Sequence, residues 1–248
     1  MAKTVLEIFE RRVNESGTRT ALIYKDQDEW LEQSWREWWE ESERIAAGLI
    51  DLGVEPGESV SILSNTRPEW VWCDIAVSMA GAVVVPLYPS NLPRQCAHML
   101  EDASVSTVIV EDPSQLDKIT EVRSEVDCLE NVILVDQHAL LDAPDWKGRE
   151  NVRLDEVVGG HPDWLYDLDE IASRGRRRLA DQNDFVAQRR REIEPDDTAS
   201  IVYTSGTTGQ PKGVVHTHGN FAAEIEAIRS LEILGADDRQ LLFLPLAH

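Results

Sequence analysis

The sequence predicts an α/β fold with a largely parallel β-sheet flanked by helices, and three observations support this prediction. Helical and strand patterns alternate at short intervals from about Ser34 to Leu140, which is typical of chains that build parallel sheets. A strongly β-branched run at residues 82–85 is typical of a strand. The 248 residues, 42% of them hydrophobic, are enough to bury a core of domain size.

The clearest helix is predicted to begin after Ser34. Ser34 and Glu37 have the spacing of a capping box, in which each side chain bonds to the backbone of the other residue. The helix is expected to close at Gly53, because glycine accepts the left-handed conformation that ends many helices. Apolar side chains recur between these ends at helical spacing: Trp35, Trp38, Trp39, Ile45, Ala46 and Leu49. We interpret the tryptophans as core residues rather than ligand contacts.

Beyond this helix, strands and helices are predicted to alternate in order. Pro68 marks one helix start, because a proline at the first helical position loses no hydrogen bond. The expected strands are residues 59–63, 82–85, 107–110 and 132–135, and the other expected helices are residues 93–102 and 113–125.

The periodicity weakens between Asp136 and Asp197, so we interpret residues 137–197 as a connecting or inserted region. A helical stretch is expected within it from about Trp164 to Arg191. The residues that interrupt the pattern before this stretch are Pro144, Gly148, Gly159, Gly160 and Pro162.

The charge balance restricts the classes of partner. The chain carries 24 basic and 46 acidic residues, which give a formal net charge of −22. Such a charge repels phosphate backbones and anionic membrane surfaces at long range. We therefore expect no nucleic-acid partner.

No segment has the pattern of a signal peptide or a membrane span. Residues 1–10 alternate charged with apolar side chains, and the longest apolar stretch, residues 75–87, is too short to cross a bilayer as a helix. We expect a cytoplasmic protein, and contact with the inner face of the membrane stays open. The cysteines lie far apart without paired spacing, so we interpret them as buried or idle thiols rather than disulfides or zinc ligands. They are Cys73, Cys96 and Cys128.

The most informative stretch follows a short apolar run at residues 199–203, which we predict to be a buried strand. This run leads into residues 204–213, Thr-Ser-Gly-Thr-Thr-Gly-Gln-Pro-Lys-Gly. Its four hydroxyl side chains and three glycines let hydroxyl and backbone N–H donors approach an anion, and Lys212 adds a full positive charge. Donors fixed in this way suit a polyphosphate and stabilise the charge that develops on a leaving pyrophosphate.

Alternative motifs do not match the spacing of this stretch. In the ordinary phosphate loop, counting from Gly206 would require a second glycine where Pro211 stands. The dinucleotide fingerprint is absent, and Ser205 lacks the flanking glycines of a hydrolase nucleophile elbow. A plain polar turn does not require ten ordered residues that end in Pro-Lys-Gly.

Residues 203–214 resemble, position for position, the signature loop of the adenylate-forming (AMP-binding) superfamily, which includes acyl-CoA synthetases, luciferases and peptide-synthetase adenylation domains. Residues 217–220 and 244–248 are similar to the corresponding segments of long-chain fatty acyl-CoA synthetases. Residues 65–70 and 80–89 resemble stretches of the same N-terminal subdomain. The resemblance covers nearly the whole chain and is weakest between Asp136 and Asp197.

The resemblance implies an ATP-dependent acid–thiol ligase. In the family, a carboxylate attacks the α-phosphate of ATP to give an acyl-adenylate and pyrophosphate, and the thiol of coenzyme A (CoA) then displaces AMP. Magnesium accompanies the ATP, and no metal ligand of the chain is expected. By resemblance, Lys212 steadies the loop or its charge and His248 lies beside the acyl and adenylate site as the catalytic candidate. The residues implied to hold the β- and γ-phosphates are Thr204, Ser205, Gly206, Thr207, Thr208 and Gly209.

The resemblance also implies that residues 1–248 are the N-terminal part of an adenylation domain. The family's magnesium-binding glutamate, adenine pocket and mobile C-terminal domain have no room after His248. We expect a piece of this kind to be inactive alone. Two alternatives stay open: a stand-alone nucleotide-binding or regulatory module, and an adenylating enzyme for aryl or amino acids. The substrate favoured is a long-chain fatty acid.

Seven arginines and two histidines each allow either a structural or a ligand-binding interpretation. Seven arginines in the connecting region form either a helix face paired with nearby acids, which we favour, or a patch for CoA phosphates or lipid headgroups. His216 and His218 have alternating positions that would suit a metal pair, but no third ligand is evident and we favour surface polarity. The arginines are Arg174, Arg176, Arg177, Arg178, Arg189, Arg190 and Arg191.

Overall fold

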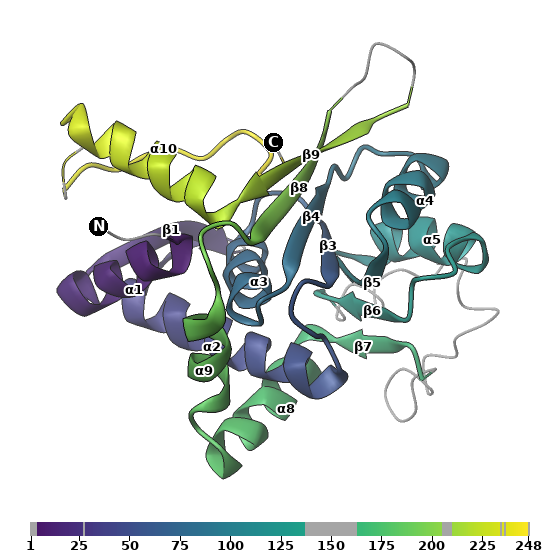
Figure 1. Cartoon of the computed structure of the whole chain (residues 1–248), viewed down its shortest axis with the longest axis horizontal. Coiled ribbons are helices and arrows are strands. Elements are labelled where there is room, and N and C mark those ends of the chain that lie inside the picture. The colour runs from purple at the N-terminus through teal and green to yellow at the C-terminus, as the bar shows by residue number, and fades with distance from the viewer. Residues whose placement is uncertain are drawn as a thin grey trace.

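The computed structural model describes residues 4–26, 28–136, 163–204, 210–233, 235 and 237–247. Over these residues the chain forms a seven-stranded sheet with helices on both faces and a separate two-stranded hairpin (Figure 1). The predicted α/β class is confirmed. Within this described part of the chain, no helix combines the length and apolar character needed to cross a membrane.

The sheet is parallel except at one edge, where β9 runs antiparallel to β8. The chain runs from β3 to β4 on one side and then crosses to β5 on the other, so the sheet has a topological switch point at β3. The strand order is β7 (Leu165–Asp167), β6 (Asn131–Leu134), β5 (Val105–Val110), β3 (Ser59–Leu63), β4 (Val83–Leu87), β8 (Thr198–Thr204) and β9 (Lys212–Thr217).

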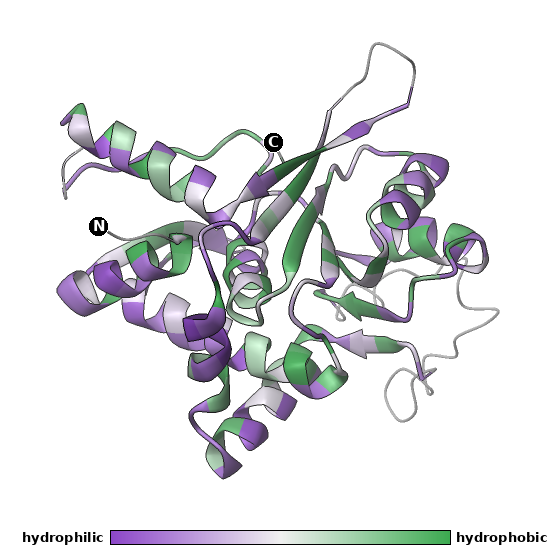
Figure 2. Cartoon of the chain, in the orientation of Figure 1, coloured by the Kyte–Doolittle hydropathy of each residue, from purple (hydrophilic) through white to green (hydrophobic). Residues whose placement is uncertain are grey.

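Two hydrophobic cores lie against opposite faces of the sheet. Along β5, Ile109 belongs to one core and its neighbours Val108 and Val110 belong to the other, as the two-residue period of a strand requires. Figure 2 shows hydrophobic residues gathered on the strands in the middle of the molecule. Burial on both faces explains why these strands are apolar and β-branched.

The helices divide between these cores. The first core contains side chains of α1 (Val5–Ser16), α2 (Trp35–Leu52), α3 (Pro68–Met79), α8 (Leu168–Asp181) and α9 (Phe185–Glu192). The second contains α4 (Pro93–Asp102) and α5 (Pro113–Val122), which continues into the 3₁₀ turn η1 (Arg123–Glu125). The remaining elements are β1 (Thr20–Asp26), β2 (Glu29–Ser34) and α10 (His218–Ser230).

Helix α2 begins and ends where the sequence predicts. The Ser34 hydroxyl accepts a hydrogen bond from the Glu37 N–H at 3.2 Å, and the Ser34 N–H donates to the Glu37 carboxylate at 2.7 Å. Gly53 ends the helix with φ 111°, in the left-handed region. Trp38 packs edge-on against Phe9 with ring centroids 4.8 Å apart. The tryptophans Trp35, Trp38 and Trp39 all pack against the first core, which confirms their interpretation as core residues.

Residues 163–197, the described part of the predicted connecting region, are packed into the fold. The expected helical stretch consists of β7, α8 and α9, and α8 packs against α2 at backbone contact. A Cβ added at Gly175 would lie 1.9 Å from the Arg44 carbonyl oxygen, so the crossing requires glycine there. Residues 137–162 lie outside the described residues, and the interpretation of the whole region as an insertion stays a prediction.

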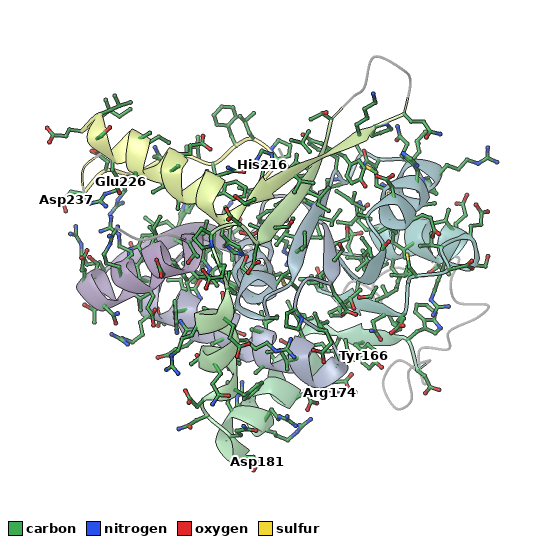
Figure 3. The ribbon with its side chains drawn as sticks, viewed as in Figure 1. Tyr166, Arg174, Asp181, His216, Glu226 and Asp237 are labelled. Carbon is green, nitrogen blue, oxygen red and sulfur yellow. The ribbon has the colours of Figure 1, made fainter. Side chains whose placement is uncertain are left out.

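Five of the seven arginines of this region are paired with acids, as favoured. Arg178 lies 3.8 Å from Asp51 and Arg190 lies 3.3 Å from Glu10. Arg174 contacts the Tyr166 ring at 4.9 Å, and both side chains are labelled in Figure 3. The remaining ion pairs are Arg174–Glu170, Arg189–Glu55 and Arg191–Asp184.

Candidate functional site

The predicted phosphate-binding stretch is carried by the β8–β9 hairpin, which projects beyond the rest of the sheet (Figure 1). Thr204 and Lys212 are paired in register at the end of this hairpin, and both are exposed. The strand predicted at residues 199–203 is confirmed as β8. Five of the predicted phosphate contacts, Ser205, Gly206, Thr207, Thr208 and Gly209, lie outside the described residues, as does His248.

The strand register places one hydroxyl residue opposite one lysine at the end of the hairpin. Because Thr204 and Lys212 face each other across the strand pair, a hydroxyl donor and an ammonium group border the intervening stretch from both sides. An anion held there would meet a positive charge and hydrogen-bond donors at once, as a polyphosphate requires.

Helix α4 contacts β8 and the residue that directly precedes β9, and sequence reasoning missed these contacts. The Tyr203 hydroxyl donates to Asp102 at 2.6 Å, and Nε2 of His98 lies 3.3 Å from the carbonyl oxygen of Pro211. Burial and the hydrogen bond to Asp102 raise the pKa of Tyr203 above its ordinary value, so the phenol stays protonated as a donor. The four-residue spacing of His98 and Asp102 indicates a shared helix face, but nothing local indicates its partner.

The final glycine of the stretch has a packing role. Gly213 lies opposite Tyr203 in the strand register. A Cβ added at Gly213 would lie 3.4 Å from Cζ of Tyr203 and 2.7 Å from a methyl carbon of Ile201. Glycine therefore leaves room for the Ile201 methyl group, whereas an added Cβ would come only into ordinary contact with the Tyr203 ring.

A second pair of distant segments meets at the carboxyl end of β3. The Thr66 hydroxyl donates to the carbonyl oxygen of Leu244 at 3.0 Å. Leu246 packs against the first core, and Ala247 is 2% exposed. Two segments that carry the family resemblance, residues 65–70 and 244–248, therefore lie together over the residues described, at the sheet edge where open α/β sheets bind ligands.

Charged side chains stabilise this same connection. Arg67 donates to Glu69 at 2.6 Å and lies 3.7 Å from Glu111, which also accepts hydrogen bonds from the backbone and side-chain nitrogens of Asn65. Burial works to lower the pKa of Arg67, but Glu69, Glu111 and Asp136 outweigh it, so the pKa is raised. A cavity of about 240 Å³ borders Arg67 and Glu69. The acids compensate the guanidinium charge, which indicates a structural role.

The larger cavity lies at the opposite edge of the sheet. It has a volume of about 410 Å³ and is lined by Gly57, Ser59, Val83 and Thr198, at the amino ends of β3, β4 and β8, and by Arg189. It is therefore separate from the stretch between Thr204 and Lys212, which follows the carboxyl end of β8.

The histidine pair is arranged differently from the expected surface groups. His216 lies at the end of β9 with its ring 5.4 Å from the Phe221 ring, whereas His218 begins α10 and is 2% exposed. Burial lowers the pKa of His218 below its ordinary value. The surface interpretation is therefore wrong for His218, because β9 ends at Thr217 and His218 is buried as the first residue of α10. Over the described ranges, no group of three or more His, Cys, Asp or Glu side chains could hold a metal ion.

The cysteines are free thiols, as expected. Cys73 and Cys96 are buried, and Cys128 is partly buried. Burial raises the pKa of Cys96 to about 11 and raises that of Cys73 further. Thiols of this kind stay protonated and unreactive near neutral pH.

The chain matches known proteins along nearly its whole length. A family model described as AMP-binding enzyme matches residues 9–248. A long-chain-fatty-acid–CoA ligase, ACSBG2 of Xenopus laevis, is 29% identical over 249 residues, which cover 99% of this chain and 31% of the relative. FadD15, a long-chain-fatty-acid–CoA ligase of Mycobacterium bovis, is 32% identical over 205 residues, which cover 82% of this chain and 30% of the relative. The chain thus spans about a third of the length of these curated relatives.

Solved structures agree in fold. The long-chain-fatty-acid-CoA ligase FadD1 from Archaeoglobus fulgidus superposes with a TM-score of 0.75 at 22% sequence identity. The match covers 99% of this chain and 42% of that structure.

Proposed function

Because the chain belongs to the AMP-binding enzyme family, we propose that its complete gene product activates a carboxylic acid with ATP and transfers the acyl group to CoA. The two long-chain-fatty-acid–CoA ligases similar to it support a long-chain fatty acid as the substrate. The single observation that carries the proposal is the family match over residues 9–248, which includes the stretch bordered by Thr204 and Lys212.

The proposed reaction has two steps. A carboxylate oxygen attacks the α-phosphorus of ATP, the bond to the β-phosphate oxygen breaks, and acyl-adenylate and pyrophosphate result. The thiol of CoA releases its proton to solvent, its sulfur attacks the acyl carbon, and AMP leaves with the electron pair of the broken bond, so that a thioester remains. Both steps place negative charge on a leaving phosphate group, which donors arranged in advance stabilise.

The chain's own residues contribute to the first step. We propose that Lys212 and the donors from Thr204 to Gly209 hold the β- and γ-phosphates and stabilise the departing pyrophosphate. The exposure of the Lys212 side chain at the hairpin supports this role, because its charge is available to a ligand. His248 is proposed to lie beside the acyl and adenylate groups. That role rests on the family resemblance alone.

Magnesium belongs to the proposal as the counter-ion of ATP. Mg²⁺ retains several waters and is commonly bound through substrate phosphates with one or two carboxylates. The donor set at the hairpin, hydroxyl groups and an ammonium, suits phosphate oxygens rather than a cation. We therefore propose that the ion enters with the nucleotide.

ATP–pyrophosphate exchange in the complete gene product tests the proposal. The assay is run with acids of increasing chain length, an aryl acid and an amino acid. We expect exchange that depends on a long-chain acid, followed by thioester formation when CoA is added. Exchange that depends on the aryl or amino acid instead would contradict a fatty-acid substrate and favour an adenylating enzyme for aryl or amino acids. Nucleotide binding without exchange would favour a binding or regulatory module.

A protein limited to residues 1–248 is expected to form no acyl-CoA. Stabilising the transition state requires donors around both the leaving pyrophosphate and the attacked phosphate, and we propose that this chain supplies only the first group. Thioester formation by purified residues 1–248 would show that the reacting groups lie within this chain.

A further inference from the structure

Helix α4 contacts the hairpin at two points, one on β8 and one directly before β9. Tyr203, bonded to Asp102 at 2.6 Å, directly precedes Thr204, the last residue of β8. Pro211, whose carbonyl oxygen lies 3.3 Å from Nε2 of His98, directly precedes the first residue of β9. Since residues four apart lie one turn apart on the same helix face, one face of α4 contacts both ends of the phosphate-binding stretch.

The helix that makes these contacts is itself fixed. Its other face packs into the second core. Pro93 begins the helix, and the backbone N–H of Leu92 donates to the Gln95 side chain at 2.9 Å. Lys118 of α5 bonds to the carbonyl oxygen of Pro89, in the connection that leads to α4. The side chains buried on the inner face of α4 are Cys96, Met99 and Leu100.

The two strands of the hairpin differ in burial at the contact with α4. Tyr203 is 8% exposed and lies opposite Gly213 of β9, where an added Cβ would come into ordinary contact with its ring. By contrast, β9 exposes Lys212, Gly213, Val214 and Val215 to solvent. A hairpin with so little packing of its own depends on a few side-chain contacts for its position.

We propose that Asp102 and His98 are positioning residues that hold the hairpin on α4 through Tyr203 and Pro211, so that Thr204 and Lys212, which we propose contact the ATP phosphates, are in place before the nucleotide binds. The inference rests on the proposed function, because it assigns the contact a role in ATP binding. Donors held in place before the ligand arrives avoid an ordering cost on binding. Loss of the contact should therefore weaken the use of ATP and leave the use of the carboxylic acid unchanged.

Kinetics of the complete gene product test this role. Tyr203→Phe and Asp102→Ala should each lower kcat/KM for ATP about 3- to 10-fold, the range that the loss of one hydrogen bond predicts, with KM for the acid unchanged. Asp102→Asn should recover most of the loss, because its carbonyl oxygen still accepts from Tyr203. In the same way, His98→Gln keeps a donor for the Pro211 carbonyl, so its kcat/KM for ATP should be higher than that of His98→Leu.

Tyr166→Phe is the matched control. The Tyr166 hydroxyl donates to the Asp163 carbonyl at 2.7 Å on β7, at the other edge of the sheet. This variant also loses one phenol hydroxyl and one hydrogen bond, but kcat/KM for ATP should stay at the wild-type value. Equal losses in Tyr203→Phe and Tyr166→Phe would overturn the inference, because the effect would then be general.

Amide hydrogen exchange without nucleotide separates this inference from the proposed function. Tyr203→Phe should speed exchange at Gln210, Lys212 and Gly213, whereas β3 and β4 should keep wild-type protection. Unchanged exchange at the hairpin, or faster exchange with an unchanged kcat/KM for ATP, would overturn the positioning role. If the wild type shows no ATP–pyrophosphate exchange, the proposed function fails, and the hydrogen-exchange result alone decides whether α4 holds the hairpin.

Discussion

The centre of the sheet and the β8–β9 hairpin are held by different means. Every residue of β3 and β4 is buried, whereas the first four residues of β9 are exposed. The central strands gain a parallel neighbour on each side and a hydrophobic core on each face, but β9 pairs only with β8. The difference indicates that stability resides in the sheet and that the hairpin, held by side chains of α4, is available for chemistry.

This comparison predicts the largest loss of stability from a core substitution. Ile133 on β6 is fully buried, and Ile133→Ala should lower the free energy of unfolding by about 2–5 kcal/mol through lost burial and a cavity. Val215 on β9 is 57% exposed, so Val215→Ala should change it by less than about 0.5 kcal/mol. Urea denaturation of both variants measures the difference. Similar losses at the two sites would end the distinction between core and hairpin.

A pH-dependent effect on stability is expected from a carboxyl group beside the core. Burial raises the pKa of Asp74 on α3 from 3.8 to about 7. Between these values the unfolded chain releases the proton while the folded protein keeps it, so the free energy of unfolding falls as pH rises from about 4 to about 7. The slope from this group is at most about 1.4 kcal/mol per pH unit.

Asp74→Asn should remove this slope, and it is measured by urea denaturation at pH 4.5, 6 and 7.5. The exposed Asp181 provides the control, because Asp181→Asn should follow the wild-type pH dependence. An unchanged slope in Asp74→Asn would show that the carboxyl group is hydrated in the folded protein.

The smallest effects are expected among the paired arginines. Arg189 donates to the carbonyl oxygens of Val54 and Ala80 at 3.0 and 3.3 Å and its side chain is 19% exposed, so Arg189→Gln should cost about 1–3 kcal/mol. The Arg191 side chain is 69% exposed and lies 3.6 Å from Asp184, so Arg191→Gln should cost less than about 0.5 kcal/mol. Thermal unfolding of the two variants measures the loss of stability in each. A larger loss in Arg191→Gln would contradict the assignment of these roles by burial.

Local patterns predicted most of the sheet and its helices. Helix α4 covers the predicted residues 93–102, and α2 begins at the predicted capping box, because caps, prolines and apolar spacing act over a few residues. The helical stretch after Trp164 was less well predicted. It contains the strand β7 and two helices, since the pairing of β7 with β6 depends on a distant partner.

The candidate site was predicted only as a stretch of sequence. The hydroxyl residues and glycines of the run from Thr204 to Lys212 indicated a phosphate-binding stretch, but nothing near it indicated that α4 contacts Tyr203 and Pro211. The burial of His218 was missed for the same reason, because it depends on how α10 packs after β9. Contacts between elements far apart in the chain leave no local periodicity to detect.

ATP–pyrophosphate exchange in Lys212→Ala, with the free energy of unfolding measured on the same protein, tests the central claim most directly. Lys212 is exposed on the hairpin, so its loss should change stability by less than about 0.5 kcal/mol. Exchange should fall about 100- to 1000-fold, as expected when one group that stabilises the leaving pyrophosphate is removed. Thr207→Ala should also lower ATP–pyrophosphate exchange. Unchanged exchange in both variants, or a loss of exchange matched by a loss of stability, would contradict the claim that the hairpin carries the chemistry and the sheet the stability.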